Sequence, residues 1–130
     1  MGASIEHQLL CKVIETGDFH TIQKLKINEG FFLGDQTQYK EIFRALSGHF
    51  HHPHTAGTIP SWPIVSSWFP GFAWIWTQDS VATLCGELRK AKLRAQLVGL
   101  ADEIVLRANA DPEEALNVVK EASAKLHTEH

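Results

Sequence analysis

The sequence predicts an all-α protein in which a small helical head precedes a long antiparallel helical hairpin. Apolar residues recur at intervals of three and four along most of the chain, which is the spacing of amphipathic helices. Residues 79–111 contain no proline, and residues 45–78 contain no Asp, Glu, Lys or Arg. We therefore expect one structural domain with two parts: a head, residues 1–78, that includes an aromatic-rich uncharged region, and a hairpin, residues 79–130.

The head begins with two predicted helices. Ser4 is a suitable N-cap for a helix that ends at Gly17, a residue favoured at the C′ position. Asp18 then caps a short second helix, residues 19–27. The loop that follows carries Phe31 and Phe32, which we expect to insert into the core.

A third helix is expected over residues 37–50. Its buried face would consist of Tyr39, Ile42, Phe43 and Leu46, which are spaced at three and four residues. Gly48 lies near its expected end.

All four tryptophans lie in the uncharged region, which we expect to be irregular chain with one short helix. Ser61 can cap a helix of about two turns, with Pro63 tolerated in its first turn. Pro70 and Gly71 would end this helix. Its core-facing residues would be Ile64, Val65, Trp68 and Phe69.

The last third carries two heptad-like rows. The first row consists of Val81, Leu84, Leu88, Ala91, Ala95 and Val98, and the second of Leu93, Leu97, Leu100 and Ile104. Asp111 and Pro112 provide an N-cap and an N1 proline for a final helix that carries Ala115, Val119, Ala122 and Leu126. The short link between the helices makes them antiparallel.

A hairpin of this length cannot bury both rows against itself, because a helix that is apolar on two faces needs another partner. That partner is either the head or a second copy of the chain, and the length of the hairpin favours self-association. The residues expected to provide self-association or hairpin cohesion are Leu84, Leu88, Leu93, Leu97, Leu100, Val119 and Leu126.

Charge and cysteine content exclude some classes of protein. The net charge is -3 with neutral histidines, whereas a free-standing DNA-binding module is usually basic. Cys11 and Cys85 lie in apolar helical patterns and are expected to be buried free thiols, which is typical of a cytoplasmic protein. No apolar run reaches the roughly 20 residues of a membrane span, and the N-terminus does not resemble a secretory signal.

The sequence nominates no catalytic, cofactor-binding or metal-binding residues. It contains no P-loop, GxSxG, HExxH or GxGxxG motif. The acidic pairs Asp102–Glu103 and Glu113–Glu114 are adjacent in sequence and therefore lie on different helix faces. This chain by itself is not expected to be an enzyme.

Four histidines, His49, His51, His52 and His54, lie within six residues. Pairs at i, i+2 in extended chain could hold a metal weakly, but zinc sites need a third or fourth ligand that the sequence does not provide. A pH switch is also possible in principle. We favour a solvated loop that leaves the third helix.

A basic cluster at residues 87–94 contains Arg89, Lys90, Lys92 and Arg94. These four residues extend over more than half a helical turn, so a solvated helix face is the simplest interpretation. The alternative is a surface for an acidic partner or for nucleic-acid phosphates.

The order of these elements resembles the N-terminal domain of DnaB-type replicative helicases, in the divergent form of phage and prophage helicases. The matching stretches are residues 4–46 for the head, "IPSWPIVSSWFPGF" for the segment after the histidine run, and residues 80–104 with 111–126 for the hairpin. The insert "FHHPHTAG" and the additional tryptophans depart from that family's pattern.

The resemblance implies a non-catalytic domain that forms the collar of a ring-shaped hexamer. Hairpins of neighbouring subunits would pair, and the surface would dock DNA primase or a helicase loader, with weak or indirect contact to DNA. The ATPase domain of the helicase would follow in the parent chain. The alternative is a stand-alone helical adaptor or DNA-binding regulator.

Overall fold

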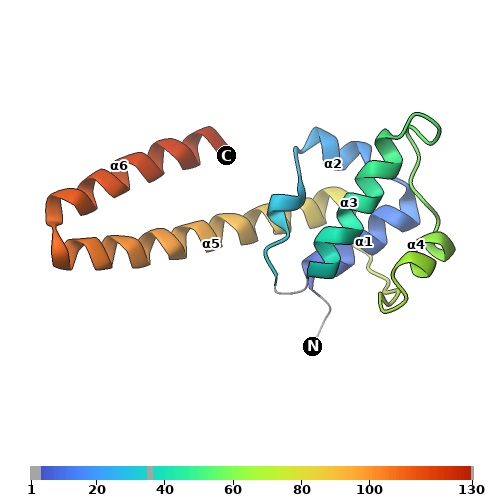
Figure 1. Cartoon of the computed structure of the whole chain (residues 1–130), viewed down its shortest axis with the longest axis horizontal. Helices are drawn as coiled ribbons and strands as arrows, with labels where there is room; N and C mark the ends of the chain where they lie inside the picture. The colour runs from blue at the N-terminus through green and yellow to red at the C-terminus, as the bar shows by residue number, and fades with distance from the viewer. Residues whose placement is uncertain (1–3, 35–36, 130) are drawn as a thin grey trace. The chain divides into compact units, whose positions relative to one another are not determined.

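The computed structural model of the chain describes the backbone of residues 4–34 and 37–129, and their side chains as far as Lys125. Every regular element in these residues is helical, and a helical head is followed by a long antiparallel hairpin, as predicted (Figure 1). The elements are α1 (Ile5–Thr16), α2 (His20–Lys24), the 3₁₀ helix η1 (Glu29–Phe31), α3 (Thr37–His51), α4 (Trp62–Trp68), α5 (Val81–Ala110) and α6 (Pro112–Glu129).

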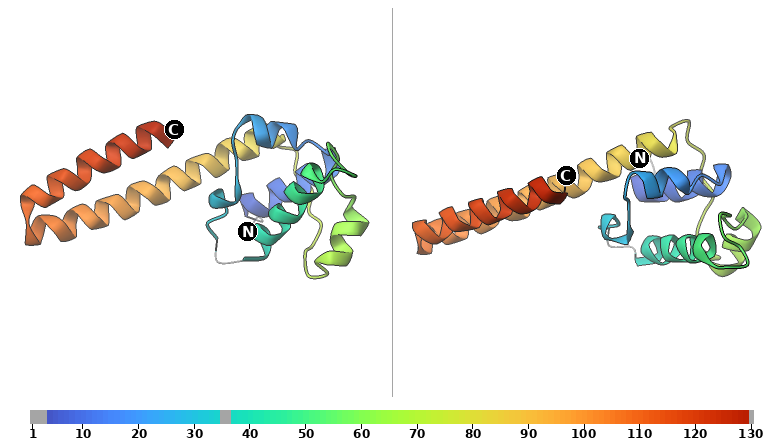
Figure 2. Two further views of the ribbon diagram at one scale, coloured as in Figure 1. Left: turned by 45° about the horizontal axis from the view of Figure 1, so that its top comes forward. Right: turned by 90° about the horizontal axis from the view of Figure 1, so that it is seen from above.

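The chain forms two compact units, Met1–Lys90 and Ala91–His130. The first unit contains the head and the first turns of α5, whereas the second contains the rest of α5 and α6. A hydrophobic core extends through the first unit, and α1 packs against α3 within it (Figure 2).

The caps predicted for α1 are present. The Ser4 hydroxyl accepts a hydrogen bond from the His7 backbone N–H at 3.2 Å, and Gly17 adopts the left-handed conformation with φ 71°. The Gly17 N–H donates to the Val13 carbonyl at 2.7 Å, which satisfies one of the free carbonyls at the helix end. Local chemistry therefore sets both ends of this helix.

The second helix is shorter than predicted and ends in a Schellman motif. The Ile27 N–H donates to the Ile22 carbonyl and the Lys26 N–H to the Gln23 carbonyl, both at 3.0 Å. Lys26 occupies the C′ position with φ 58°, the only positive φ outside glycine among the described residues. A lysine here adopts a conformation that usually selects glycine.

The third helix continues beyond Gly48 through His51. His49 lies in this helix, as its predicted range of 37–50 implies, and His51 extends the helix by one residue beyond that range, while His52 and His54 lie in the loop that leaves it. Phe50, between His49 and His51, is buried, and its ring lies 4.9 Å from that of Phe19. Burial of Phe50 gives the last turn of α3 a packing contact. This contact outweighs the poor helix propensity of Gly48.

The short helix in the uncharged region begins after Ser61, as predicted. Val65 is buried and Phe69 packs against the core, but Ile64 and Trp68 are 43% and 49% exposed, so the prediction that these two face the core was wrong. A helix of two turns buries one narrow stripe, and residues 64 and 68 lie beside that stripe.

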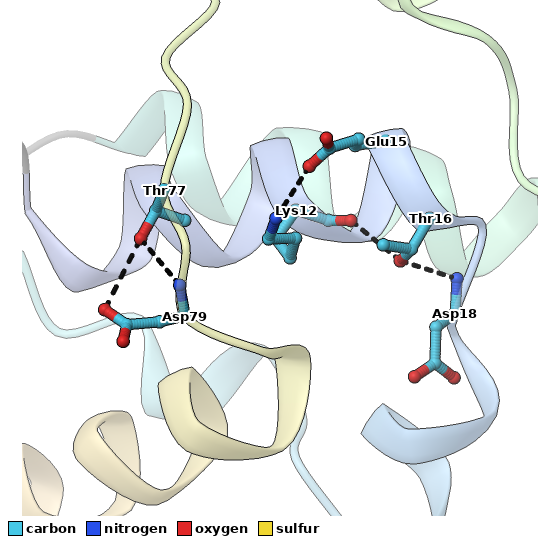
Figure 3. A network of polar contacts seen from close by, with 6 residues as sticks. All are labelled: Lys12, Glu15, Thr16, Asp18, Thr77 and Asp79. Atoms are coloured by element: carbon cyan, nitrogen blue, oxygen red, sulfur yellow. Dashed lines mark hydrogen bonds and ion pairs between the residues drawn. The ribbon is translucent and has the colours of Figure 1, made fainter.

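The chain between α4 and α5 crosses the side of α1 (Figure 3). The Thr16 hydroxyl donates to the Lys12 carbonyl at 2.8 Å and accepts from the Asp18 N–H at 3.2 Å. Thr77 accepts from the Asp79 N–H at 3.2 Å, which forms the turn that leads into α5. Both hydroxyls thus accept from N–H groups of residues that lie outside the helices.

Ser80 is the N-cap of α5, since its hydroxyl accepts from the Thr83 N–H at 3.1 Å. Four residues in the first turns of α5 are buried in the head core at helical spacing: Val81, Leu84, Cys85 and Leu88. The first turns of α5 are therefore part of the head.

Candidate functional site

The hairpin turn is built by one acidic cap and an arginine. The Asp111 carboxylate accepts from the Glu113 and Glu114 N–H groups at 3.1 and 3.4 Å, so Asp111 caps α6 as predicted. Arg107 lies 3.8 Å from Glu103 within α5 and 3.8 Å from Glu114, and the second ion pair joins α5 to α6. Within the second unit, α6 runs back along α5 (Figure 1).

The second unit has almost no core of its own. Among the described side chains of residues 91–125, Ala115 alone is buried. The predicted cohesion residues Leu93 and Leu100 are half-buried, as are Val118 and Ala122. A helix pair that buries this little apolar surface lacks the main stabilising term of a folded unit.

Large apolar side chains are instead exposed on both arms of this unit. Two of them, Leu97 and Val119, are residues predicted to form the association surface, and they are 49% and 38% exposed. Those not singled out as site residues, with their exposed fractions, are Val98 58%, Val105 62%, Leu106 70% and Leu116 55%.

The exposed residues lie on a definite side of the hairpin. A groove of about 340 Å³ between the arms is lined by Gln96, Leu100 and Glu103 of α5 and by Val118, Glu121, Ala122 and Lys125 of α6. Leu97 and Val119 each follow a groove residue, so each is turned about 100° from it. Because the arms are antiparallel, this turn brings both side chains to the same side of the pair, away from the groove.

We define the hairpin face as the apolar side chains on that side together with those that further steps along each helix place on the adjoining outer edges of the two arms. Steps of three and four residues continue it along each helix, as in a coiled-coil seam. Its members are Leu97, Val98, Ala101 and Val105 of α5 and Leu116 and Val119 of α6. The signal that could have extended the prediction to Val105 and Leu116 is this same spacing.

Two residues predicted for the hairpin have a different position. Leu84 and Leu88 are 1% and 2% exposed and lie in the head core, so they are not available to a second copy. The heptad-like row is real, but its first half packs into the core of the head. The side chain of Leu126 lies outside the described residues.

The four residues of the predicted basic surface also have different surroundings. Arg89 is half-buried, donates to the Leu25 carbonyl and lies 5.3 Å from the centre of the Phe31 ring, so it is engaged inside the head. Lys90 forms an exposed ion pair with Glu87 at 3.4 Å. Lys92 is half-buried and Arg94 is exposed. The four residues do not form one basic stripe.

Two of the four histidines contact other parts of the head, whereas His52 and His54 contact each other. His49 Nδ1 lies 2.9 Å from the Thr58 carbonyl, and His51 Nε2 lies 3.1 Å from Gln23. The His54 backbone N–H donates to His52 Nδ1 at 3.2 Å. No group of three or more His, Cys, Asp or Glu residues suited to a metal ion occurs in the described part of the chain.

Burial and one ion pair shift the titration of a few groups. Burial raises the pKa of the Cys85 thiol to about 11 and also raises the pKa of Cys11. Both are free and buried, as predicted. Desolvation raises the pKa of Glu6, whose Oε1 has no hydrogen-bond partner, whereas the hydrogen bonds from Arg44 lower the pKa of Glu29. None of these groups forms a catalytic pair.

No helix among the described residues is long and apolar enough to cross a membrane. Comparisons with models of known families, with curated proteins and with solved structures find no match to this chain.

Proposed function

We propose that this chain is a non-catalytic assembly domain that associates with a second copy through the hairpin face. The observation that carries the proposal is a contrast among the described side chains of the second unit: one alanine is buried, whereas the five large apolar side chains of the hairpin face are 38–62% exposed. Exposed apolar area of this kind marks interaction sites in soluble proteins.

A second copy is the simplest occupant because the hairpin face repeats at heptad-like intervals on two antiparallel arms. Two such faces related by a two-fold axis can interdigitate, as in a helical bundle. Covering five half-exposed side chains on each copy yields roughly 1 kcal/mol per side chain. Against an association cost of about 4 kcal/mol, the low end of its usual range, this gross gain of about 10 kcal/mol leaves about 6 kcal/mol, which corresponds to a Kd of tens of micromolar.

The sequence resemblance makes the proposal more specific. A head followed by a long hairpin is the architecture expected for the N-terminal domain of a DnaB-type replicative helicase. By this proposal the domain contributes to a ring collar in the cytoplasm and docks DNA primase or a helicase loader, while the helicase ATPase lies outside residues 1–130. Titration with purified primase from the same source, followed by light scattering, tests this finer claim.

The hairpin face is tested with one substitution and a matched control. Leu97→Asp places a charge in the face, whereas Leu106→Asp places the same charge nine residues later, two and a half turns away on the opposite side of α5. Leu106 is the more exposed of the two, at 70% against 49%. We expect Leu97→Asp to lower the oligomer mass and Leu106→Asp to leave it unchanged, with equal helicity by circular dichroism.

The same experiment separates the proposal from the adaptor alternative. If the Leu97→Asp variant keeps full helicity and still forms oligomers, the hairpin face is not the association surface. Submicromolar DNA binding that weakens with added salt would instead favour a DNA-binding regulator, although the net charge of -3 argues against it.

A further inference from the structure

Arg89 makes two contacts with a segment far from it in sequence. Its guanidinium donates to the carbonyl of Leu25 and lies over the ring of Phe31, 5.3 Å from the ring centre. Both partners belong to the connection from α2 through η1, and Arg89 lies on α5. The residue is thus a cross-link within the first unit.

The carbonyl that accepts from Arg89 belongs to Leu25, the C-cap residue of α2, and carbonyls at a helix end lack an intrahelical partner. In the Schellman motif at the end of α2, the carbonyls of Ile22 and Gln23 accept from Ile27 and Lys26. The Leu25 carbonyl, immediately before the left-handed Lys26, accepts from Arg89. The arginine therefore stabilises the backbone at the point where the chain adopts its least favourable conformation.

The segment that Arg89 contacts forms part of the head surface. Asn28 and Glu29 line a pocket of about 380 Å³ together with Phe43, Arg44 and other residues of α3. Glu29 forms a two-pronged ion pair with Arg44, with donor–acceptor distances of 2.5 and 3.1 Å. The position of this segment decides whether that pair and that pocket exist.

We propose that Arg89 is a latch, a positioning residue on α5 that holds the Leu25–Phe32 segment in its folded conformation. The hairpin residues lie further along the same helix. Loss of both guanidinium contacts would release the segment and its pocket, while Leu84, Cys85 and Leu88 keep the first turns of α5 in the head core.

The test is hydrogen exchange, measured by mass spectrometry on the full chain, for Arg89→Met, Arg89→Lys and the neighbouring control Lys90→Met. A hydrogen bond from a charged donor contributes about 1.5–3 kcal/mol, so we expect Arg89→Met to accelerate exchange at Ile27, Phe31 and Phe32 by about tenfold or more. Arg89→Lys, which keeps the charge and one donor, should give a smaller acceleration. Lys90→Met and the amides of α1 and α3 should exchange as in the wild type.

A second substitution separates a latch from a general loss of stability. Lys26→Gly in the Arg89→Met background should restore protection at Ile27, because it removes the backbone strain, but not at Phe31, which has lost the guanidinium above its ring. Unchanged exchange of the segment in Arg89→Met, or equal acceleration throughout α1 and α3, would overturn the proposal. If Arg89→Met does not fold, Arg89→Lys is used instead. Faster exchange confined to the Leu25–Phe32 segment supports the proposal, and unchanged or uniformly faster exchange overturns it.

Discussion

The lysine at the C′ position of α2 gives a prediction with a definite sign. Lys26 has φ 58°, where a side chain costs about 1–2 kcal/mol relative to glycine. Glycine in turn lowers the free energy of unfolding by about 0.4–1 kcal/mol, because it increases the conformational entropy of the unfolded chain. The balance predicts that Lys26→Gly raises the free energy of unfolding by about 0.5–1 kcal/mol.

The matched control is Lys24→Gly, two residues earlier and inside α2. Both lysines are exposed, so the two variants lose the same surface charge. Lys24 has helical geometry, and glycine there should lower the free energy of unfolding by up to about 1 kcal/mol. The two identical substitutions should therefore change the stability in opposite directions.

Urea denaturation followed by tryptophan fluorescence measures this difference in the head. All four tryptophans lie between residues 62 and 76, within the first unit, so the signal reports on the part of the chain that contains Lys26. An increase in the midpoint with an unchanged slope would confirm the prediction. If Lys26→Gly is as destabilising as Lys24→Gly, the account of strain at this helix end is wrong.

Two further predictions concern titratable groups. Because burial raises the pKa of Cys85 to about 11, its thiolate is scarce at pH 8, and we expect Ellman's reagent to modify it in urea but only very slowly in the folded chain; rapid modification of the native protein would contradict its burial. Because Arg44 lowers the pKa of Glu29 below its ordinary 4.5, the pair contributes stability above that pH and loses it as the pH falls through the lower folded value. The stability difference between the wild type and Glu29→Gln should accordingly disappear in acid, and a difference that is independent of pH would argue against this ion pair.

The helix ends could be predicted from the sequence where a single residue determines them. Ser4, Gly17 and Asp111 act through their own side chain or backbone freedom, and each has the predicted role. The end of α2 was placed too late because its C′ residue is lysine, and only the hydrogen bonds from Ile27 to Ile22 and from Lys26 to Gln23 reveal the motif.

The partner of an apolar row could not be predicted from its spacing. The heptad-like row of α5 is continuous in sequence, yet Leu84 and Leu88 enter the head core and Val98 is exposed. Periodicity identifies which residues share a face, but the tertiary arrangement decides what covers each part of that face. The same limit applies to Trp68, whose apolar character predicted a burial that its short helix does not provide.

The position of Arg89 shows this limit for charge as well. Four basic residues within six positions indicate a charged helix face, and nothing local separates Arg89 from Lys90. The distinction comes from a carbonyl and an aromatic ring more than fifty residues away in the chain.

Pairing of the hairpin face with a second copy of the chain can be measured in solution. Sedimentation velocity of the wild-type chain from about 1 to 200 μM measures this pairing, because a net gain of about 6 kcal/mol gives a Kd of tens of micromolar, inside this range. We expect the mass of the wild-type chain to rise with concentration from the 14.5 kDa of the monomer to at least that of a dimer. The Leu97→Asp variant should remain a monomer over the same range. A wild-type chain that remains monomeric at the highest concentration would contradict the proposed pairing.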